Sequence, residues 1–394
     1  MSVEIRAITD KELDEFTNVA ATALGVRAET PWNFPPENTL CAFEDGKIAT
    51  TYAAWPYTMY FNGKDAPVAG IAAVGTLPVY RRRGYLRRIT AAHFQRMYQD
   101  GERSISILYP SQTAIYQRYG YAMVTTQYTW QIRPHNIQFA NPEPVEGVLR
   151  VVANDELESL GQIYEGFCRE KTGCLYRNRD WWAGILTPPR QGVFSKVIYQ
   201  ENDKPLGYVL YIIESAGAGF PNQQLKIREF AWLTNTAHQA IWQYLAGLDL
   251  IGNITKPDVP PDYSLLHLLL EPRTPSIIST NGLMARLVDV SRALVQRNYP
   301  AEGRLTFKLR DEFCLWNEGC WEMETSGDET SVRKTDGSPQ LVMPVSTLAL
   351  LAFGRISATE AARMKLLDAM EPDMLPAWDM VMRTAYQPTC MDHF

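Results

Sequence analysis

Two hairpin turns near the N-terminus constrain the fold of this chain more than any other feature. Asp45-Gly46 and Asn62-Gly63 separate alternating or apolar runs within residues 38–79. Such dipeptides are typical of two-residue loops between antiparallel strands, so this stretch predicts three or four antiparallel strands. A dinucleotide-binding unit would instead begin with a parallel strand followed by G-x-G-x-x-G, and that pattern is absent.

The hairpins lie between two predicted helices. The first covers residues 9–25, where Thr9 and Glu12 have capping-box spacing and Gly25 can end the helix. The second covers residues 84–99, with Leu86, Ile89, His93 and Met97 along one face, where His93 is expected to be a packing residue. A strand (104–110), a short helix (111–120) and a closing strand (121–132) complete one α/β unit.

The same order of elements is predicted a second time. It comprises a helix (158–173), a strand pair around Asn202-Asp203, a strand (224–233), a helix (234–249) and a strand (263–271). A third segment predicts a helix over 283–297, strands over 303–313 and 320–327, and a helix with a Ser357/Glu360 capping box. We therefore expect an α/β (α+β) chain with domains at 1–134, 135–281 and 282–394, which suits its 394 residues.

Five arginines surround the start of the second helix: Arg81, Arg82, Arg83, Arg87 and Arg88. A helix N-terminus presents unpaired N–H groups and about half a positive charge, so it can bind a phosphate group. Gly84 permits close backbone approach, and arginines add charge-assisted hydrogen bonds. A solvated basic helix start is the alternative. The net charge of −6 argues against a nucleic-acid partner and favours a small anion.

The composition excludes several other classes. The N-terminal residues lack the basic start and apolar core of a signal peptide, and no apolar run approaches the ~18 residues of a membrane span. The six cysteines contain no CxxC pair and lack histidine partners at zinc-site spacing, so we expect reduced thiols and no metal. A cytoplasmic protein is the resulting expectation.

The stretch "VGTLPVYRRRGYL" resembles the acetyl-CoA loop of the GNAT N-acetyltransferases, whose pattern is Arg or Gln, two residues, Gly, one residue, then Gly or Ala. Here Leu86 replaces the final small residue. "RRRGYLR" followed by "SQTAIYQRYGYAMVT" is similar to the Eis-type branch, which joins an active GNAT unit, a second GNAT-like unit and a sterol-carrier-protein-like domain. The second unit has Thr234 to Ala237 where the first has its basic turn.

The resemblance implies acetyl-CoA as co-substrate and assigns its contacts. The backbone of the strand before the loop would pair with the pantetheine arm, at Val74, Gly75 and Thr76. The pyrophosphate would bind to the loop formed by Arg82, Arg83, Gly84, Tyr85, Leu86 and Arg87. Ser111 and Gln112 would supply a further contact. Core packing remains the alternative for the strand residues.

The resemblance also implies the catalytic groups. Tyr116 matches the tyrosine that gives a proton to the departing thiolate, with Tyr119 and Tyr121 as neighbouring alternatives that are expected to pack in the core. The α-carboxylate of Phe394 matches the terminal carboxylate that serves as base. A terminal carboxylate is intrinsically a weak base, so it would require burial or a water relay.

For the acceptor, the family implies primary amines of polyamine-like or aminoglycoside-like molecules or exposed lysines. Trp32 and Asp392 are the candidate acceptor contacts, although core packing is an equal alternative for Trp32 and His393 stands where relatives carry an acid. The family also implies a homo-oligomer, usually a hexamer. Acyl transfer to another amine and a non-catalytic binder of acyl-CoA or an apolar ligand are the alternative functions.

Overall fold

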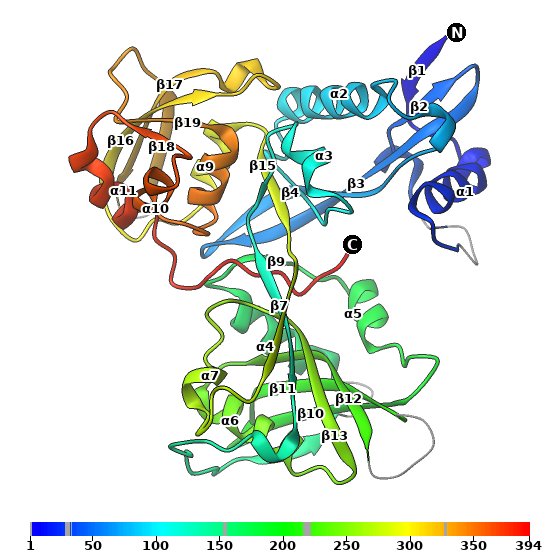
Figure 1. The fold of residues 1–394 in the computed structure, drawn as a ribbon, viewed down its shortest axis with the longest axis vertical. Coiled ribbons are helices and arrows are strands. Elements are labelled where there is room, and N and C mark those ends of the chain that lie inside the picture. Colours follow the sequence, from blue (N-terminus) through cyan, green and yellow to red (C-terminus); the bar gives the residue numbers. More distant parts are fainter. Residues whose placement is uncertain (1, 28–31, 33, 153–155, 216–221, 327–328) are drawn as a thin grey trace. The chain divides into compact units, whose positions relative to one another are not determined.

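The structure is a computed structural model that describes all residues except 1, 28–31, 33, 153–155, 216–221 and 327–328. The chain forms two compact units (Figure 1). The first unit contains residues 1–124, 282–384 and 392–394, and the second contains residues 125–281 and 385–391. Both units are therefore built from segments that are distant in the sequence.

The first unit contains a mixed sheet. Its strand order is β1 (Val3–Arg6), β2 (Cys41–Glu44), β3 (Lys47–Phe61), β4 (Lys64–Thr76), β5 (Ile105–Leu108), β15 (Met284–Leu287) and β6 (Ala122–Met123). Along this order, β4 and β5 pair in parallel and the other neighbours pair antiparallel. The hairpin turns at Asp45-Gly46 and Asn62-Gly63 are confirmed, because all four residues have positive φ angles of 48° to 92°.

The helices of this sheet are α1 (Leu13–Leu24), α2 (Tyr85–Asp100) and α3 (Thr113–Gln117), and each was predicted. The capping box is present, since the Thr9 N–H donates to the Glu12 carboxylate at 2.8 Å. Gly25 ends α1 with a φ of 71°. Ile89, Phe94 and Met97 of α2 are buried in the core beneath the sheet.

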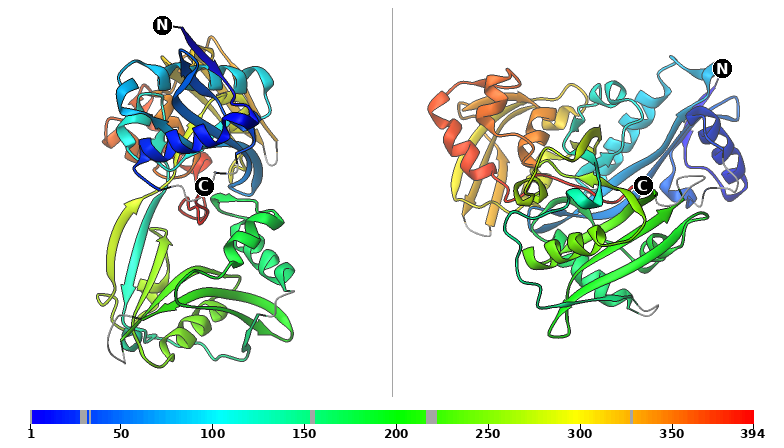
Figure 2. Two further views of the ribbon diagram at one scale, coloured as in Figure 1. Left: turned by 90° about the vertical axis from the view of Figure 1, so that its right-hand side faces the viewer. Right: turned by 60° about the horizontal axis from the view of Figure 1, so that its bottom comes forward.

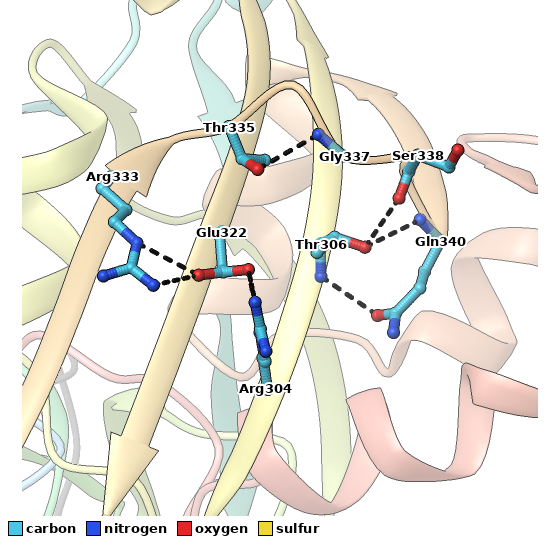
Figure 3. Close-up of polar contacts among 8 residues, drawn as sticks. All are labelled: Arg304, Thr306, Glu322, Arg333, Thr335, Gly337, Ser338 and Gln340. Atoms are coloured by element: carbon cyan, nitrogen blue, oxygen red, sulfur yellow. Dashed lines mark hydrogen bonds and ion pairs between the residues drawn. The ribbon is translucent and has the colours of Figure 1, made fainter.

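The first unit also contains a second sheet, in the order β18 (Glu329–Lys334), β17 (Gly319–Ser326), β16 (Gly303–Arg310), β19 (Leu341–Pro344) and β20 (Asp368–Ala369). Helices α8 (Val290–Val295), α9 (Val345–Ala352), α10 (Ala358–Arg363) and α11 (Leu375–Met382) accompany it. Figure 3 shows Glu322 of β17 accepting hydrogen bonds from Arg304 of β16 and Arg333 of β18. These bonds lower the pKa of Glu322 and join three strands.

The second unit is a twisted mixed sheet (Figure 2). Its order is β14 (Ser276–Asn281), β7 (Thr126–Ile132), β13 (Ile251–Val259), β12 (Gln223–Trp232), β11 (Lys204–Glu214), β10 (Val193–Glu201) and β8 (Val148–Val151). Only β12 and β13 pair in parallel. The unit also contains α4 (Leu157–Cys168), β9 (Thr172–Leu175), α5 (Arg179–Leu186), α6 (Asn235–Ala246) and α7 (Leu265–Leu268).

Three predicted elements were wrong. The strand expected at 263–271 contains α7, and the strand parallel to β12 is β13, whose Pro257 lies at an irregularity in the pairing with β7. The helix expected at 283–297 is a buried strand, β15, followed by α8, which Asp289 caps. The single strand expected at 121–132 is two strands, and the longer, β7, belongs to the second unit's sheet.

Within the described ranges of the chain, we find no helix that combines the length and the apolar character needed to cross a membrane.

A buried ion pair joins the two sheets of the first unit. Arg286 of β15 and Asp311, which follows β16, are both almost fully buried, and the Arg286 guanidinium donates to the Asp311 carboxylate at 2.6 Å. The same carboxylate accepts from the Asn317 amide at 2.9 Å and from the Cys314 N–H at 3.0 Å. Gly120 leaves the space for this guanidinium, since a Cβ there would lie 1.8 Å from its Nη1.

We expect Asp311→Ala to destabilise the first unit by about 3–5 kcal/mol, because it leaves a buried guanidinium without its anion. Urea unfolding followed by circular dichroism measures the change. The control is Asp368→Ala, which removes the exposed pair with the neighbouring Arg310 and should leave the midpoint nearly unchanged. Equal shifts for the two variants would contradict this account of the interface.

Candidate active site

The parallel strands β4 and β5 separate part of the way along their length. They pair from Val68 with Ile105 to Ile71 with Leu108, whereas β4 continues to Thr76. Over its last five residues β4 pairs with β3, and among the described residues no strand pairs with its other edge. The predicted residues Val74, Gly75 and Thr76 lie on this stretch, whose outer edge can pair with an extended ligand. The Thr76 carbonyl oxygen already accepts a hydrogen bond from the exposed Arg81 side chain at 3.2 Å.

A bulge interrupts β4 at the start of this open stretch. Ala73 has a φ of 51°, and the register between β3 and β4 shifts between Thr51 and Ala53. The fully buried Thr51 hydroxyl holds the bulge, with the Ala73 carbonyl oxygen at 2.8 Å and the Gly75 carbonyl oxygen at 3.3 Å. The bulge therefore reorients the backbone where the strands diverge.

The basic turn joins this strand to α2. Arg82 and Gly84 both adopt left-handed backbone conformations, with φ angles of 64° and 77°. When left-handed residues alternate with other residues before a helix, successive backbone N–H groups point toward the same place. This arrangement is favourable for binding an anion. No described side chain caps α2, so the N–H groups of its first turn remain available. Arg82, Arg87 and Arg88 are exposed beside this turn.

Two of the predicted loop side chains have another partner. The Arg83 guanidinium lies 2.5 Å from the Glu44 carboxylate, and the Tyr85 hydroxyl donates a hydrogen bond to the same carboxylate. The pKa of Glu44 is lowered, mainly by the hydrogen bond from Tyr85 and to a smaller extent by the hydrogen bond and charge of Arg83. Sequence reasoning missed Glu44, which ends β2. Arg83 and Tyr85 thus brace the turn, and Leu86 packs partly against the core.

Tyr116 lies in α3 and is 7% exposed. Its ring packs edge-on against Tyr121 at 6.0 Å between centroids. Burial raises the pKa of Tyr116 to about 12, while a side-chain hydrogen bond with Ser111 acts in the opposite direction. The group is therefore a neutral phenol at physiological pH and can donate a proton or a hydrogen bond. Ser111 and Gln112 are exposed just before α3.

The last residue lies at the point where β4 and β5 part. The Phe394 ring packs edge-on against Tyr57 of β3 at 5.1 Å and against Tyr109, which follows β5, at 5.6 Å. A Cβ at Gly70 would lie 3.0 Å from the Phe394 ring and 2.5 Å from the Tyr57 ring. Gly70 and Tyr109 each lie next to the last paired residue of their strand. Because Gly70 has no side chain, the Phe394 ring can pack at this position.

An aromatic series links Phe394 to Trp32. From Trp32 the ring centroids follow at 6.3 Å to Phe34, 5.0 Å to Trp55, 6.5 Å to Tyr57 and then to Phe394. Trp55 and Tyr57 are two residues apart in β3 and therefore face the same side of the sheet. The series brings the candidate acceptor residue Trp32 and the chain end onto one wall. Asp392, in contrast, is only 2% exposed, so it lies beneath the surface.

A cavity of about 210 Å³ adjoins this wall at Trp55 and is lined by Tyr52 of β3 and His93 of α2. The Tyr52 hydroxyl and His93 Nδ1 are 2.8 Å apart. Burial lowers the pKa of His93 to about 4, so its imidazole is neutral at physiological pH. This hydrogen-bonded pair fits the packing role predicted for His93.

The second unit lacks the features that make the first helix an anion site. At the start of α6, the Thr234 hydroxyl accepts a hydrogen bond from the Ala237 N–H at 3.1 Å and caps the helix. No arginine stands between β12 and α6. Among the residues that the structure describes, no cluster of His, Cys, Asp or Glu side chains is arranged to hold a metal ion.

Comparison with protein families agrees with this geometry. Residues 4–124 match a family described as an acetyltransferase (GNAT) domain, and residues 173–287 match a second family with the same description. Residues 290–391 match the sterol carrier protein domain. The mixed α/β fold class, with two GNAT-like units and a sterol-carrier-protein-like domain, is confirmed.

Several known proteins are similar over most of the chain. An uncharacterized N-acetyltransferase of Streptomyces avermitilis is 27% identical over 338 residues, which are 83% of this chain and 82% of that protein. N-acetyltransferase Eis of Mycobacterium tuberculosis is 26% identical over 334 residues, which are 82% of this chain and 81% of that protein.

Two solved structures share the fold over its full length. A GCN5-related N-acetyltransferase from Anabaena variabilis has a TM-score of 0.89 and 24% identity, with 100% of both chains covered. Eis1 from Mycobacterium abscessus has a TM-score of 0.85 and 24% identity, with 99% of this chain and 100% of that chain covered. The chain is therefore an acetyl-CoA-dependent N-acetyltransferase with two tandem GNAT domains and a C-terminal sterol-carrier-protein-like domain, and it is similar over most of its length to N-acetyltransferase Eis.

Proposed function

We propose that the first unit transfers the acetyl group of acetyl-CoA to a primary amine of a polyamine-like or aminoglycoside-like molecule or of an exposed lysine. The observation that carries this proposal is the seat of Phe394 at the point where β4 and β5 diverge. The same divergence leaves an open strand edge that leads to the uncapped start of α2. A cofactor arm along that edge would bring its thioester toward the chain end.

The proposed cofactor contacts follow the open edge. Backbone groups of Val74, Gly75 and Thr76 bind the pantetheine arm. The N–H groups of residues 82–87 bind the pyrophosphate, aided by the exposed guanidinium groups of Arg82 and Arg87. Arg83 and Tyr85 contribute through their backbone, because their side chains bind Glu44. Ser111 and Gln112, exposed before α3, supply a further contact.

Acetyl transfer forms a C–N bond between the acceptor amine and the carbonyl carbon and breaks the C–S bond of the thioester. Tyr116 supplies a proton to the departing thiolate, a role that its raised pKa and its neutral phenol support. The α-carboxylate of Phe394 accepts the proton that the amine loses, directly or through water. Since a carboxylate is a weak base, we place Phe394 as the acceptor of the proton that the nitrogen loses once the neutral fraction of the amine has attacked the carbonyl carbon.

The acceptor would lie along the aromatic wall from Trp32 to Phe394. Flat rings suit the apolar faces of a sugar or an alkyl chain, and they also attract ammonium groups. Asp392 would add negative charge from beneath the surface and favour a polycation.

Thiol release from acetyl-CoA, measured with spermidine, kanamycin and a lysine peptide, tests the proposal. Turnover with at least one amine supports it. Tight CoA binding without turnover on any amine would instead favour a non-catalytic binder, the alternative function.

We expect Arg82→Gln to weaken CoA binding about tenfold or more, since it removes a charged hydrogen bond worth ~1.5–3 kcal/mol. Isothermal titration calorimetry measures the change. The matched control is Arg96→Gln in α2, the helix that follows the turn. The Arg96 guanidinium pairs with Asp100 at 3.4 Å, and Arg96 is remote from the turn in sequence. Unchanged CoA affinity in the Arg82 variant would remove this residue from the site.

We expect Tyr116→Phe to lower kcat about 100-fold, in line with the loss of a general acid, while the affinity for CoA stays the same. Stopped assays of thiol release at saturating acetyl-CoA give kcat. Tyr119→Phe removes a hydroxyl three residues away and should leave kcat within a few-fold of the natural protein. A similar loss in both variants would point to packing rather than proton donation.

We expect two glycines added after Phe394 to lower kcat about 100-fold, because they move the carboxylate by up to ~7 Å. The thermal unfolding midpoint and CoA affinity should stay unchanged. Gly70→Ala provides an independent test, since its methyl group would collide with the Tyr57 and Phe394 rings. Full activity in both variants would exclude the chain end from the reaction.

A further inference from the structure

The second unit contains a cavity of about 430 Å³ that the proposed reaction does not use. It lies where β12 and β13 separate, since these parallel strands pair only from Gln223 with Ile251 to Lys226 with Thr255. Its wall combines the ends of these strands with the start of α6, the end of α4 and residues 386–391. Five aromatic side chains line it: Phe167, Phe230, Trp232, Tyr263 and Tyr386.

Lys256 is a buried cation in the wall of this cavity. Its side chain is 6% exposed, and its ammonium lies 5.8 Å from the centre of the Phe230 ring and 5.4 Å from that of Tyr263. Within the described part of the chain, it makes no hydrogen bond or ion pair. Burial lowers the pKa of Lys256 to about 8, and the charges of Asp258 and then Glu229 offset only part of that effect.

The nearby carboxylate of Glu229 does not serve as that anion. It accepts hydrogen bonds from the Arg177 guanidinium at 2.9 and 2.6 Å and another from the Tyr208 hydroxyl. Glu229 is thus neutralised by a buried arginine. Asp258, also in the cavity wall, acts on Lys256 through its charge, and among the described residues Lys256 forms no ion pair.

A second buried polar group lies in the same wall. Thr389 is 2% exposed, and its hydroxyl has no hydrogen-bond partner among the described residues. Its backbone is fixed, since its N–H donates to the Thr172 carbonyl oxygen at 2.9 Å. A Cβ at Gly173 would lie 2.5 Å from the Thr389 carbonyl oxygen, so the segment is closely packed. The free hydroxyl is therefore held in place at the cavity.

Other polar groups of the wall are already occupied or lie at its rim. Asp262 accepts a hydrogen bond from the Gln387 N–H at 2.7 Å. The Lys171 ammonium donates to the Phe167 carbonyl oxygen at 2.7 Å and lies close to the Phe167 and Tyr386 rings. Glu170 is exposed. Among the described residues of the wall, Lys256 and Thr389 are the buried polar side chains that make no hydrogen bond.

We propose that the second unit binds a small carboxylate with an aromatic or similarly apolar body, whose carboxylate is held by Lys256 and Thr389. The aromatic walls bury the apolar body, and the carboxylate supplies the missing anion and acceptor. The capped start of α6 and the absence of arginines before it disfavour a phosphate or a nucleotide.

Calorimetry with benzoate, phenylacetate and indole-3-acetate tests the proposal. The full chain is saturated with CoA, so that the basic turn of the first unit cannot bind the probes. At least one probe should bind, and indole-3-acetate should bind at least tenfold more tightly than the uncharged indole-3-acetamide. No heat with any probe at millimolar concentration, or equal affinity for the acid and the amide, would overturn the proposal.

Variants assign the site. Lys256→Met should remove the preference for the acid, and Thr389→Val should weaken acid binding several-fold. Lys226→Met is the matched control, because Lys226 belongs to the same unit and forms an exposed ion pair with Glu214. This variant should bind the acid probes as tightly as the natural protein. Undiminished acid binding in both the Lys256 and Thr389 variants would overturn the assignment. If Lys256→Met fails to fold, the Thr389 variant and the comparison of acid with amide decide the question.

Discussion

The separation of β4 from β5 beyond the pairing of Ile71 with Leu108 is the constraint on which the site depends. Two parallel strands that stay paired would satisfy each other's backbone groups, whereas strands that part leave N–H and C=O groups for a ligand. The bulge at Ala73, fixed by the buried Thr51 hydroxyl, lies at the start of the open edge. The edge leads to a turn whose left-handed residues and uncapped helix favour an anion. A strand edge suited to an extended arm and a turn suited to a pyrophosphate are thus consecutive in the chain.

The end of the chain belongs to both units. Residues 385–391 pack in the second unit, and residues 392–394 pack in the first. Thr389 and Met391 line the aromatic cavity, and Phe394 occupies its seat beside Gly70 a few residues later. A ligand in the cavity would therefore contact the segment that leads directly to the proposed base. The buried pair of Arg286 with Asp311 joins the GNAT sheet to the sterol-carrier-protein-like domain, from which this segment departs.

Local signals predicted much of the first GNAT unit. The Asp-Gly and Asn-Gly turns, the Thr9/Glu12 capping box and the Arg81–Leu86 pattern each depend on neighbouring residues, and each matches the structure or the family. Predictions that depend on distant partners were less successful. Residues 284–287 are buried and, apart from Arg286, apolar. This pattern suits either a helix or a strand, and the pairing with β5 selects the strand. A proline within a run of residues argues against a central strand, so Pro257 made β13 hard to predict. In the structure, Pro257 lies at a register shift in the pairing of β13 with β7. The pairing of Arg83 and Tyr85 with Glu44 spans about forty residues and has no sequence signal.

Hydrogen exchange with and without CoA tests the central claim most directly, because that claim concerns backbone N–H groups. The account predicts that CoA slows exchange at residues 74–76 and 82–87 and leaves the start of α6, at residues 235–238, unchanged. Slower exchange at α6 instead, or no change along the open edge of β4, would contradict it.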